Sequence, residues 1–162
     1  MIKFVYTLFV GILLAALVGV GIAAFYPGPK TPEPSLSIKY GQPYETLKDE
    51  TASQQIRQEQ EEFDEKMMVF QEQNKKYSRN TSIIAIIAAI LILIISLTLF
   101  KKILIIADGL LLGGVLTLAY GIIMGFGSGD NIFRFFVVCV GLIVSLFLGY
   151  IKFIKPTPSK RK

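Results

Sequence analysis

Four long apolar blocks constrain this chain more than any other feature of its sequence. They run over Phe4–Tyr26, Ile83–Phe100, Ile103–Phe126 and Ile132–Ile151. A helix needs about 20 mostly apolar residues to cross the hydrocarbon core of a bilayer, and each block reaches or approaches that length. The sequence therefore predicts an all-α integral membrane protein with four transmembrane helices rather than a single soluble domain.

The blocks also set the expected organisation of the chain. We expect transmembrane helices at 1–26, 82–100, 103–126 and 131–152, a proline-rich spacer at 27–43, a polar helix at 44–81 and a basic tail at 153–162. The apolar core of a cleaved secretory signal is about 7–15 residues long. The first block is longer, so we interpret it as a retained anchor.

The positions of the basic residues predict an orientation. Lysine and arginine near span ends favour the cytoplasmic side, and the Lys101–Lys102 turn and the tail 153–162 both carry them. Lys75, Lys76 and Arg79 argue the other way but are outweighed. We expect both termini to be cytoplasmic, in a plasma (inner) membrane. The net charge of +5 and the basic tail favour anionic lipid, and no aromatic-basic surface favours nucleic acid.

The polar segment 44–81 has the composition of a helix, since it lacks proline and glycine and is rich in Gln, Glu and Lys. Its apolar residues form a narrow seam at heptad-like spacing, namely Ile56, Phe63, Met67, Phe70 and Tyr77. Gln60 and Asn74 interrupt the seam. The helix is therefore predicted to be amphipathic and extracytoplasmic, and two interpretations stay open. The seam lies on its own bundle or on lipid headgroups, or it forms an intermolecular coiled coil.

Small residues recur every fourth position in three of the four blocks. The stripes are Thr7, Gly11, Ala15, Gly19 and Ala23; Gly109, Gly113, Thr117, Gly121 and Gly125; and Gly141, Ser145 and Gly149. Small residues let helix backbones approach closely in lipid, so we expect the third span to pack centrally against the first and fourth. The second block shows only Ala85 and Ala89, which predicts that it faces lipid more.

The sequence offers few groups for catalysis. It contains no histidine and one cysteine, Cys139. Asp108 and Asp130 are 22 residues apart, about 33 Å along one helix, so they cannot share a proton as a catalytic dyad. Asp130 is expected to cap the fourth span, and Arg134, one turn further on, either pairs with Asp130 or snorkels to the interface. Asp108 is a candidate intramembrane functional charge. It either reaches Lys101, Lys102 or headgroup water, or forms a proton or cation site.

These observations favour a protein that is not an enzyme and has no cofactor or bound metal. The leading hypothesis is an accessory, assembly or scaffold subunit in which the extramembrane helix contacts a protein partner or a second copy of the chain. The alternative is a small channel or transporter subunit with Asp108 on an ion or proton path. A third hypothesis, a lipid-interacting or membrane-shaping protein, depends on the basic tail.

Overall fold

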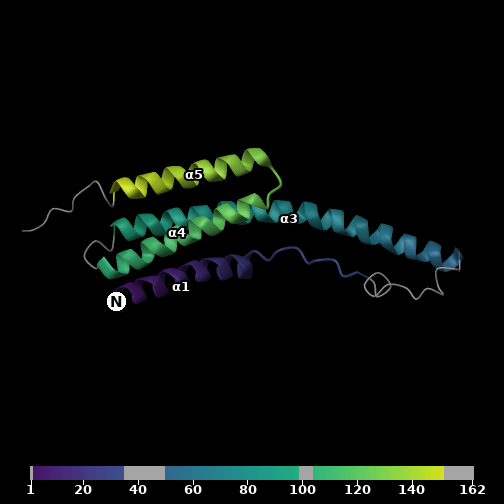
Figure 1. Cartoon of the computed structure of the whole chain (residues 1–162), viewed down its shortest axis with the longest axis horizontal. Coiled ribbons are helices and arrows are strands. Elements are labelled where there is room, and N and C mark those ends of the chain that lie inside the picture. The colour runs from purple at the N-terminus through teal and green to yellow at the C-terminus, as the bar shows by residue number, and fades with distance from the viewer. Residues whose placement is uncertain (1, 35–49, 99–103, 152–162) are drawn as a thin grey trace, which may run out of the picture. The chain divides into compact units, whose positions relative to one another are not determined.

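The protein is all-α in the part of the chain that the structure describes. The computed structural model describes residues 2–34, 50–98 and 104–151. Its helices are α1 (Ile2–Phe25), α3 (Glu50–Thr98), α4 (Leu104–Phe126) and α5 (Asn131–Gly149) (Figure 1). Each of them contains a stretch that is long and apolar enough to cross a membrane. The prediction of an all-α chain with four such helices is therefore confirmed.

The polar helix and the second span, which were predicted as adjoining segments, are one continuous helix. α3 runs from Glu50 to Thr98 without interruption. The chain has no proline or glycine from Tyr44 to Thr98, so no residue breaks the ladder of backbone hydrogen bonds. Residues 44–49, most of the spacer, the Lys101–Lys102 turn and the tail 153–162 lie outside the described residues.

The chain divides into two compact units, and the division falls within α3. The first unit, the bundle, comprises Met1–Pro27 and Tyr77–Lys162, and the second, the polar unit, comprises Gly28–Lys76. In the bundle, α1, the apolar part of α3, α4 and α5 alternate in direction (Figure 1). This up-and-down arrangement follows from the short connection between α4 and α5 and from the length of a span.

The bundle has its core between α3, α4 and α5. Ile86 and Ala89 of α3, Leu118 of α4 and Val137 of α5 form a buried apolar cluster. α1 packs on α4, where a Cβ added to Gly11 would meet the side chain of Leu112 at 2.9 Å. α4 is therefore the central helix of the bundle, because it contacts the other three.

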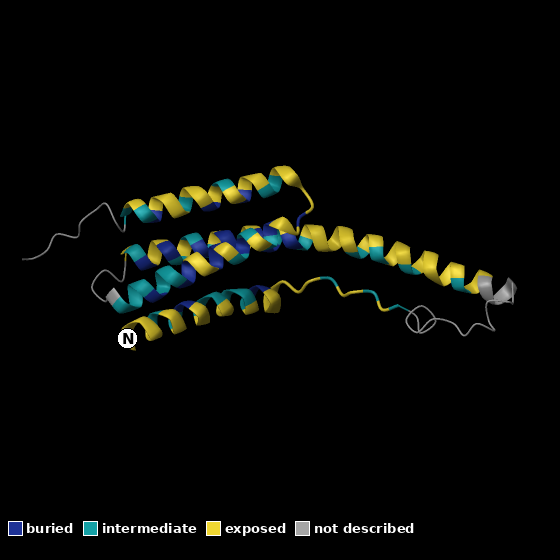
Figure 2. Ribbon diagram, in the orientation of Figure 1, coloured by how far each residue is buried: buried dark blue, intermediate teal, exposed yellow. Residues whose placement is uncertain are grey.

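The expectation that the second span faces lipid more is wrong. In the apolar window of α3, 39% of the residues are buried, as in α4, against 11% in α1 and 17% in α5. Figure 2 shows the buried face of α3 within the bundle. Ala85 and Ala89 are fully buried, and so are Thr81 and Ser82. The predicted apolar block begins at Ile83, so Thr81 and Ser82, which supply much of this face, lie just before it.

A tight turn joins α4 to α5. The backbone N–H groups of Gly127 and Ser128 donate to carbonyls of the last turn of α4, and Gly129 has a φ of 73°. A positive φ is easy only for a residue without a Cβ. The Oδ1 of Asp130 then accepts from the N–H groups of Ile132 at 2.9 Å and Phe133 at 3.4 Å. The prediction that Asp130 caps this helix is confirmed.

Candidate functional site

The small-residue stripe of α4 lies at helix contacts along its whole length. All five members are buried, namely Gly109, Gly113, Thr117, Gly121 and Gly125. A Cβ at Gly113 would lie 2.7 Å from Leu14 Cδ2 and 3.1 Å from the backbone oxygen of Gly11. α1 and α4 therefore approach each other so closely here that their backbones are nearly in contact, as small residues allow in lipid.

The stripe does not form a straight groove, because spacing by four does not match the helix period. With 3.6 residues per turn, each step of four residues advances about 40° around the helix axis. Gly109 and Gly125 therefore point in directions about 160° apart. A Cβ at Gly109 would meet Val10 of α1, whereas one at Gly125 would meet Ser82 of α3 and Val137 of α5. The stripe thus packs against α1 at one end and against α3 and α5 at the other.

The stripes of α1 and α5 are at close contacts in only part of their length. Gly11 and Gly141 lie against α4, and Ala15 and Thr7 are half-buried. Gly19 and Gly149 have no atom within 4 Å of an added Cβ, and Ser145 is exposed. No other helix of the described residues lies close to Gly19 or Gly149, and the role of these residues in packing stays a prediction. The same rotation of about 40° per step turns these residues away from α4. Unlike α4, α1 and α5 have no second neighbouring helix among the described residues on that side for them to contact.

Two hydroxyl groups, which are not among the predicted site residues, join α3 to α4. Ser82 Oγ donates to the carbonyl of Gly121 at 2.6 Å, and Ser96 Oγ donates to the carbonyl of Ala107 at 2.7 Å. Fourteen residues separate the two contacts on each helix, or about four turns. The paired bonds fix the antiparallel register of α3 and α4. Ser82 and Ser96 are two heptads apart in the sequence, and this spacing already predicts that they lie on the same face of the helix.

Asp108, the candidate intramembrane charge, lies in the second turn of α4 and is half-buried. Its neighbour Ala107 accepts the hydrogen bond from Ser96, so Asp108 lies close to the end of the α3–α4 interface. Thr117, further along the helix, is fully buried, and its hydroxyl donates to the carbonyl of Gly113 at 2.8 Å within α4. Among the described residues, no group of three or more Asp, Glu, Cys or His could hold a metal ion.

A polar aromatic cluster closes the opposite end of the bundle. The rings of Tyr26 and Tyr77 stack with centroids 5.4 Å apart, and Asn80 Nδ2 donates to the Tyr26 hydroxyl at 2.9 Å. Tyr77 was expected in the partner-facing seam, and this contact places it against α1 instead. Thr81, next in the sequence, is fully buried, and its hydroxyl has no hydrogen-bond partner among the described residues.

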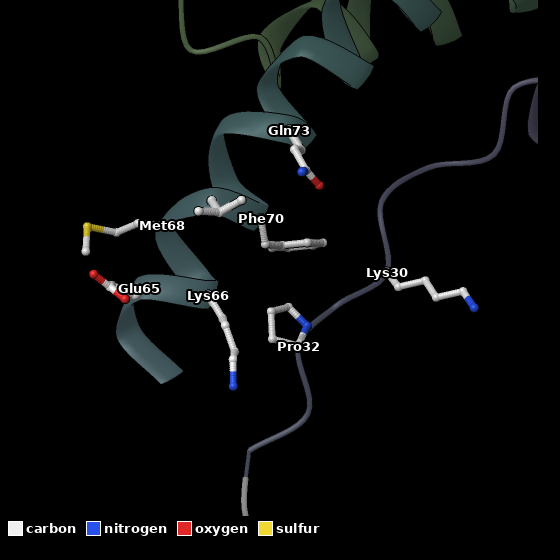
Figure 3. Close-up of a pocket in the computed structure, with 8 residues that line it drawn as sticks. Lys30, Pro32, Glu65, Lys66, Met68, Phe70 and Gln73 are labelled. Carbon is white, nitrogen blue, oxygen red and sulfur yellow. The ribbon is translucent and has the colours of Figure 1, made fainter. Parts of the chain in front are cut away.

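The rest of the predicted seam lies in the polar unit. Ile56, Phe63, Met67 and Phe70 are half-buried there, while the residues around them on α3 are exposed. The proline-rich segment covers part of this face, since Pro29, Pro32 and Pro34 are half-buried and the residues between them are exposed. In Figure 3 the ring of Phe70 points toward Pro32. Neither interpretation of the seam (packing on the bundle or on headgroups, or an intermolecular coiled coil) included this contact with the spacer, and both stay predictions.

A groove of about 650 Å³ lies between this spacer and α3 (Figure 3). Its residues are Lys30, Pro32, Glu65, Lys66, Met68, Val69, Phe70 and Gln73. Met68 and Val69 are 60% and 57% exposed, which is unusual for two adjacent apolar side chains on an otherwise charged helix. Lys66 pairs with Glu62 at 3.7 Å one turn away, and both are too exposed for the pair to add much stability.

Comparisons with family models, with curated proteins and with solved structures found no match to this chain.

Proposed function

We propose that this chain is a non-enzymatic assembly or scaffold subunit that the bundle anchors in a membrane and that binds a partner protein through its polar unit. The observation that carries the proposal is the exposed Met68–Val69 pair beside an apolar groove. An apolar surface on a charged helix is typical of a binding site for another protein. With both termini cytoplasmic in a plasma (inner) membrane, the polar unit is extracytoplasmic.

The charges of α3 favour a different protein over a second copy of this chain. Two copies in one membrane have the same orientation, so their α3 helices would pair in parallel. With Phe63 and Phe70 at d positions of a heptad, Glu59 is a g residue and Asp64 is an e residue of the next heptad. These positions meet across a parallel dimer. Like charges would therefore face each other, while Gln60 would occupy the core.

The chemistry of the groove indicates what the partner presents. Phe70, Pro32 and Val69 supply apolar surface. Of the charged residues at its edge, Lys66 pairs with Glu62 and Glu65 is acidic, so Lys30 is the positive charge that a partner would meet. A segment with an apolar side chain for the groove and a carboxylate for Lys30 matches this surface. Such a segment is the partner chemistry that we propose.

The alternative of a channel or transporter subunit gains no support from the α4 stripe. In the described residues, Gly113 contacts Leu14 and Gly121 contacts Ile86, so neither glycine lines an open path. A path past Asp108 would need a surface other than this stripe.

The proposal is tested by crosslinking from the groove of the full-length chain. A photoreactive amino acid is placed at Val69 and, as a control, at Gln71, which is exposed and about 200° around the helix. We expect one protein to be captured from Val69 and not from Gln71. After purification, that protein should bind the intact chain and not the Val69→Glu variant, while the matched Gln71→Glu variant should bind it normally.

Other outcomes would overturn the proposal. Capture of a second copy of this chain would show self-association instead of a different partner. Equal capture from Val69 and Gln71 would mean that the partner does not bind specifically at the groove. Binding that survives Val69→Glu would exclude the exposed apolar pair as the docking surface.

A further inference from the structure

Arg134 lies in the first turns of α5 with an incomplete set of partners. Its Nη1 donates to Asn131 Oδ1 at 3.3 Å, which is a long hydrogen bond. Its Nε is buried and has no hydrogen-bond partner among the described residues. A buried donor on a charged group without an acceptor is costly. Because Nε is buried, a ligand can reach the guanidinium only through its two outer nitrogens, of which Nη1 makes this one long hydrogen bond.

The acidic residue nearest in sequence does not neutralise Arg134. Asp130 is one turn earlier, at the spacing that allows pairing within a helix. Its carboxylate instead accepts from the backbone N–H groups of Ile132 and Phe133. The described residues contain no ion pair with Arg134, and the pairing with Asp130 that the spacing allowed is absent.

Arg134 lies near the start of an apolar helix that is long enough to cross a membrane. Ile132, two residues before it, and Phe135, the residue after it, are 69% and 66% exposed, so the helix presents apolar surface from its first turn. The stacked Tyr26 and Tyr77 lie at the same end of the bundle, and tyrosines are enriched at the level of the headgroups. In such a position the abundant hydrogen-bond acceptor is the phosphate group of a phospholipid.

We propose that Arg134, supported by Asn131, binds the phosphate group of a phospholipid. A guanidinium donates to two phosphate oxygens at once through its planar fork. In this proposal the two outer nitrogens donate to the phosphate oxygens, and the Asn131 amide oxygen, which accepts from Nη1, keeps the guanidinium in position. Binding involves no covalent step. The lipid supplies the negative charge that Asp130, engaged in the helix cap, does not.

The test is native mass spectrometry of the full-length chain released from detergent. The lipids are phosphatidylglycerol, phosphatidylcholine and a diacylglycerol with the same acyl chains, and inorganic phosphate is a separate arm. We expect the wild type to retain both phospholipids and to release diacylglycerol. Arg134→Gln should weaken retention about tenfold, as loss of a charged bidentate contact implies. Arg134→Lys, which keeps the charge without the fork, should lie between them.

The matched control is Arg79→Gln, which removes an exposed arginine of α3 at the same end of the bundle. It should leave lipid retention within about twofold of wild type, since a surface charge contributes little. Wild-type retention by Arg134→Gln, an equal loss in Arg79→Gln, or equal retention of diacylglycerol would overturn the proposal. Binding of inorganic phosphate in place of lipid would mean an anion site without lipid specificity, and would also overturn it. The helicity of each variant is measured by circular dichroism, and if Arg134→Gln does not fold, the Arg134→Lys variant decides.

Discussion

Adding one methyl group at Gly113 should separate α1 from α4. The new Cβ would lie 2.7 Å from Leu14 Cδ2, 2.9 Å from Leu14 Cβ and 3.1 Å from the backbone oxygen of Gly11. Carbon atoms in ordinary contact are about 3.5–4.0 Å apart. A rotation of the Leu14 side chain relieves only the first of these contacts. The other two belong to α1 itself, so α1 has to move by about 0.6 Å or more.

The magnitude is obtained from a matched pair of variants. Gly19→Ala makes the same change inside α1, where no atom lies within 4 Å of the new Cβ. Each variant gains the same helix propensity, about 1 kcal/mol at most, and this gain cancels in the comparison. What remains is the overpacking at Gly113, about 1–3 kcal/mol. We therefore expect Gly113→Ala to have the lower free energy of unfolding by that amount.

The assay is reversible unfolding of the full-length chain in mixed micelles, followed by circular dichroism. Gly19→Ala should be as stable as wild type or slightly more stable, which shows that alanine itself is tolerated in α1. If Gly113→Ala and Gly19→Ala unfold at the same denaturant concentration, the close approach of α1 and α4 is refuted. Gly149→Ala, another position with open space, provides a second control in α5.

Two further changes test the polar contacts of the bundle. Ser82→Ala and Ser96→Ala should each lower the free energy of unfolding by about 0.6–1.7 kcal/mol, the range for interhelical hydrogen bonds in membranes. Their effects should add because the sites are far apart, and a double variant no less stable than either single one would contradict this. Tyr26→Ala should increase hydrogen exchange at the end of α1, because it removes the stack on Tyr77 and the bond from Asn80. Tyr26→Phe should restore the stack alone, and equal exchange in Tyr26→Ala and wild type would show that the cluster does not hold α1.

The helices could be predicted from the sequence because length and hydropathy determine them locally. α1, α4 and α5 begin and end within about two residues of the predicted blocks, a normal uncertainty for helix ends. The continuity of α3 was available from the absence of proline and glycine between Tyr44 and Thr98. The partners of each helix were harder to predict, because they depend on faces that belong to different spans.

The buried face of α3 illustrates what the residue pattern left undecided. Ala85 and Ala89 alone resemble an ordinary lipid-facing helix, and only the addition of Thr81, Ser82 and Ser96 completes a small, polar face. In lipid, such hydroxyl groups find partners on neighbouring carbonyls. Which carbonyl each one meets depends on the register of α4, and that is a tertiary property.

The two hydrogen bonds that fix α3 against α4 lie on the same helix as the proposed docking surface. α3 belongs to both units, so the groove residues Met68 and Val69 are on the same helix that Ser82 and Ser96 fix against α4. A partner that pulls on the polar unit therefore loads the α3–α4 interface through the chain itself. In the proposed scaffold role, α4 would pass this load on to α1 and α5, which its stripe also contacts. The cluster that joins α3, α4 and α5 consists of apolar residues.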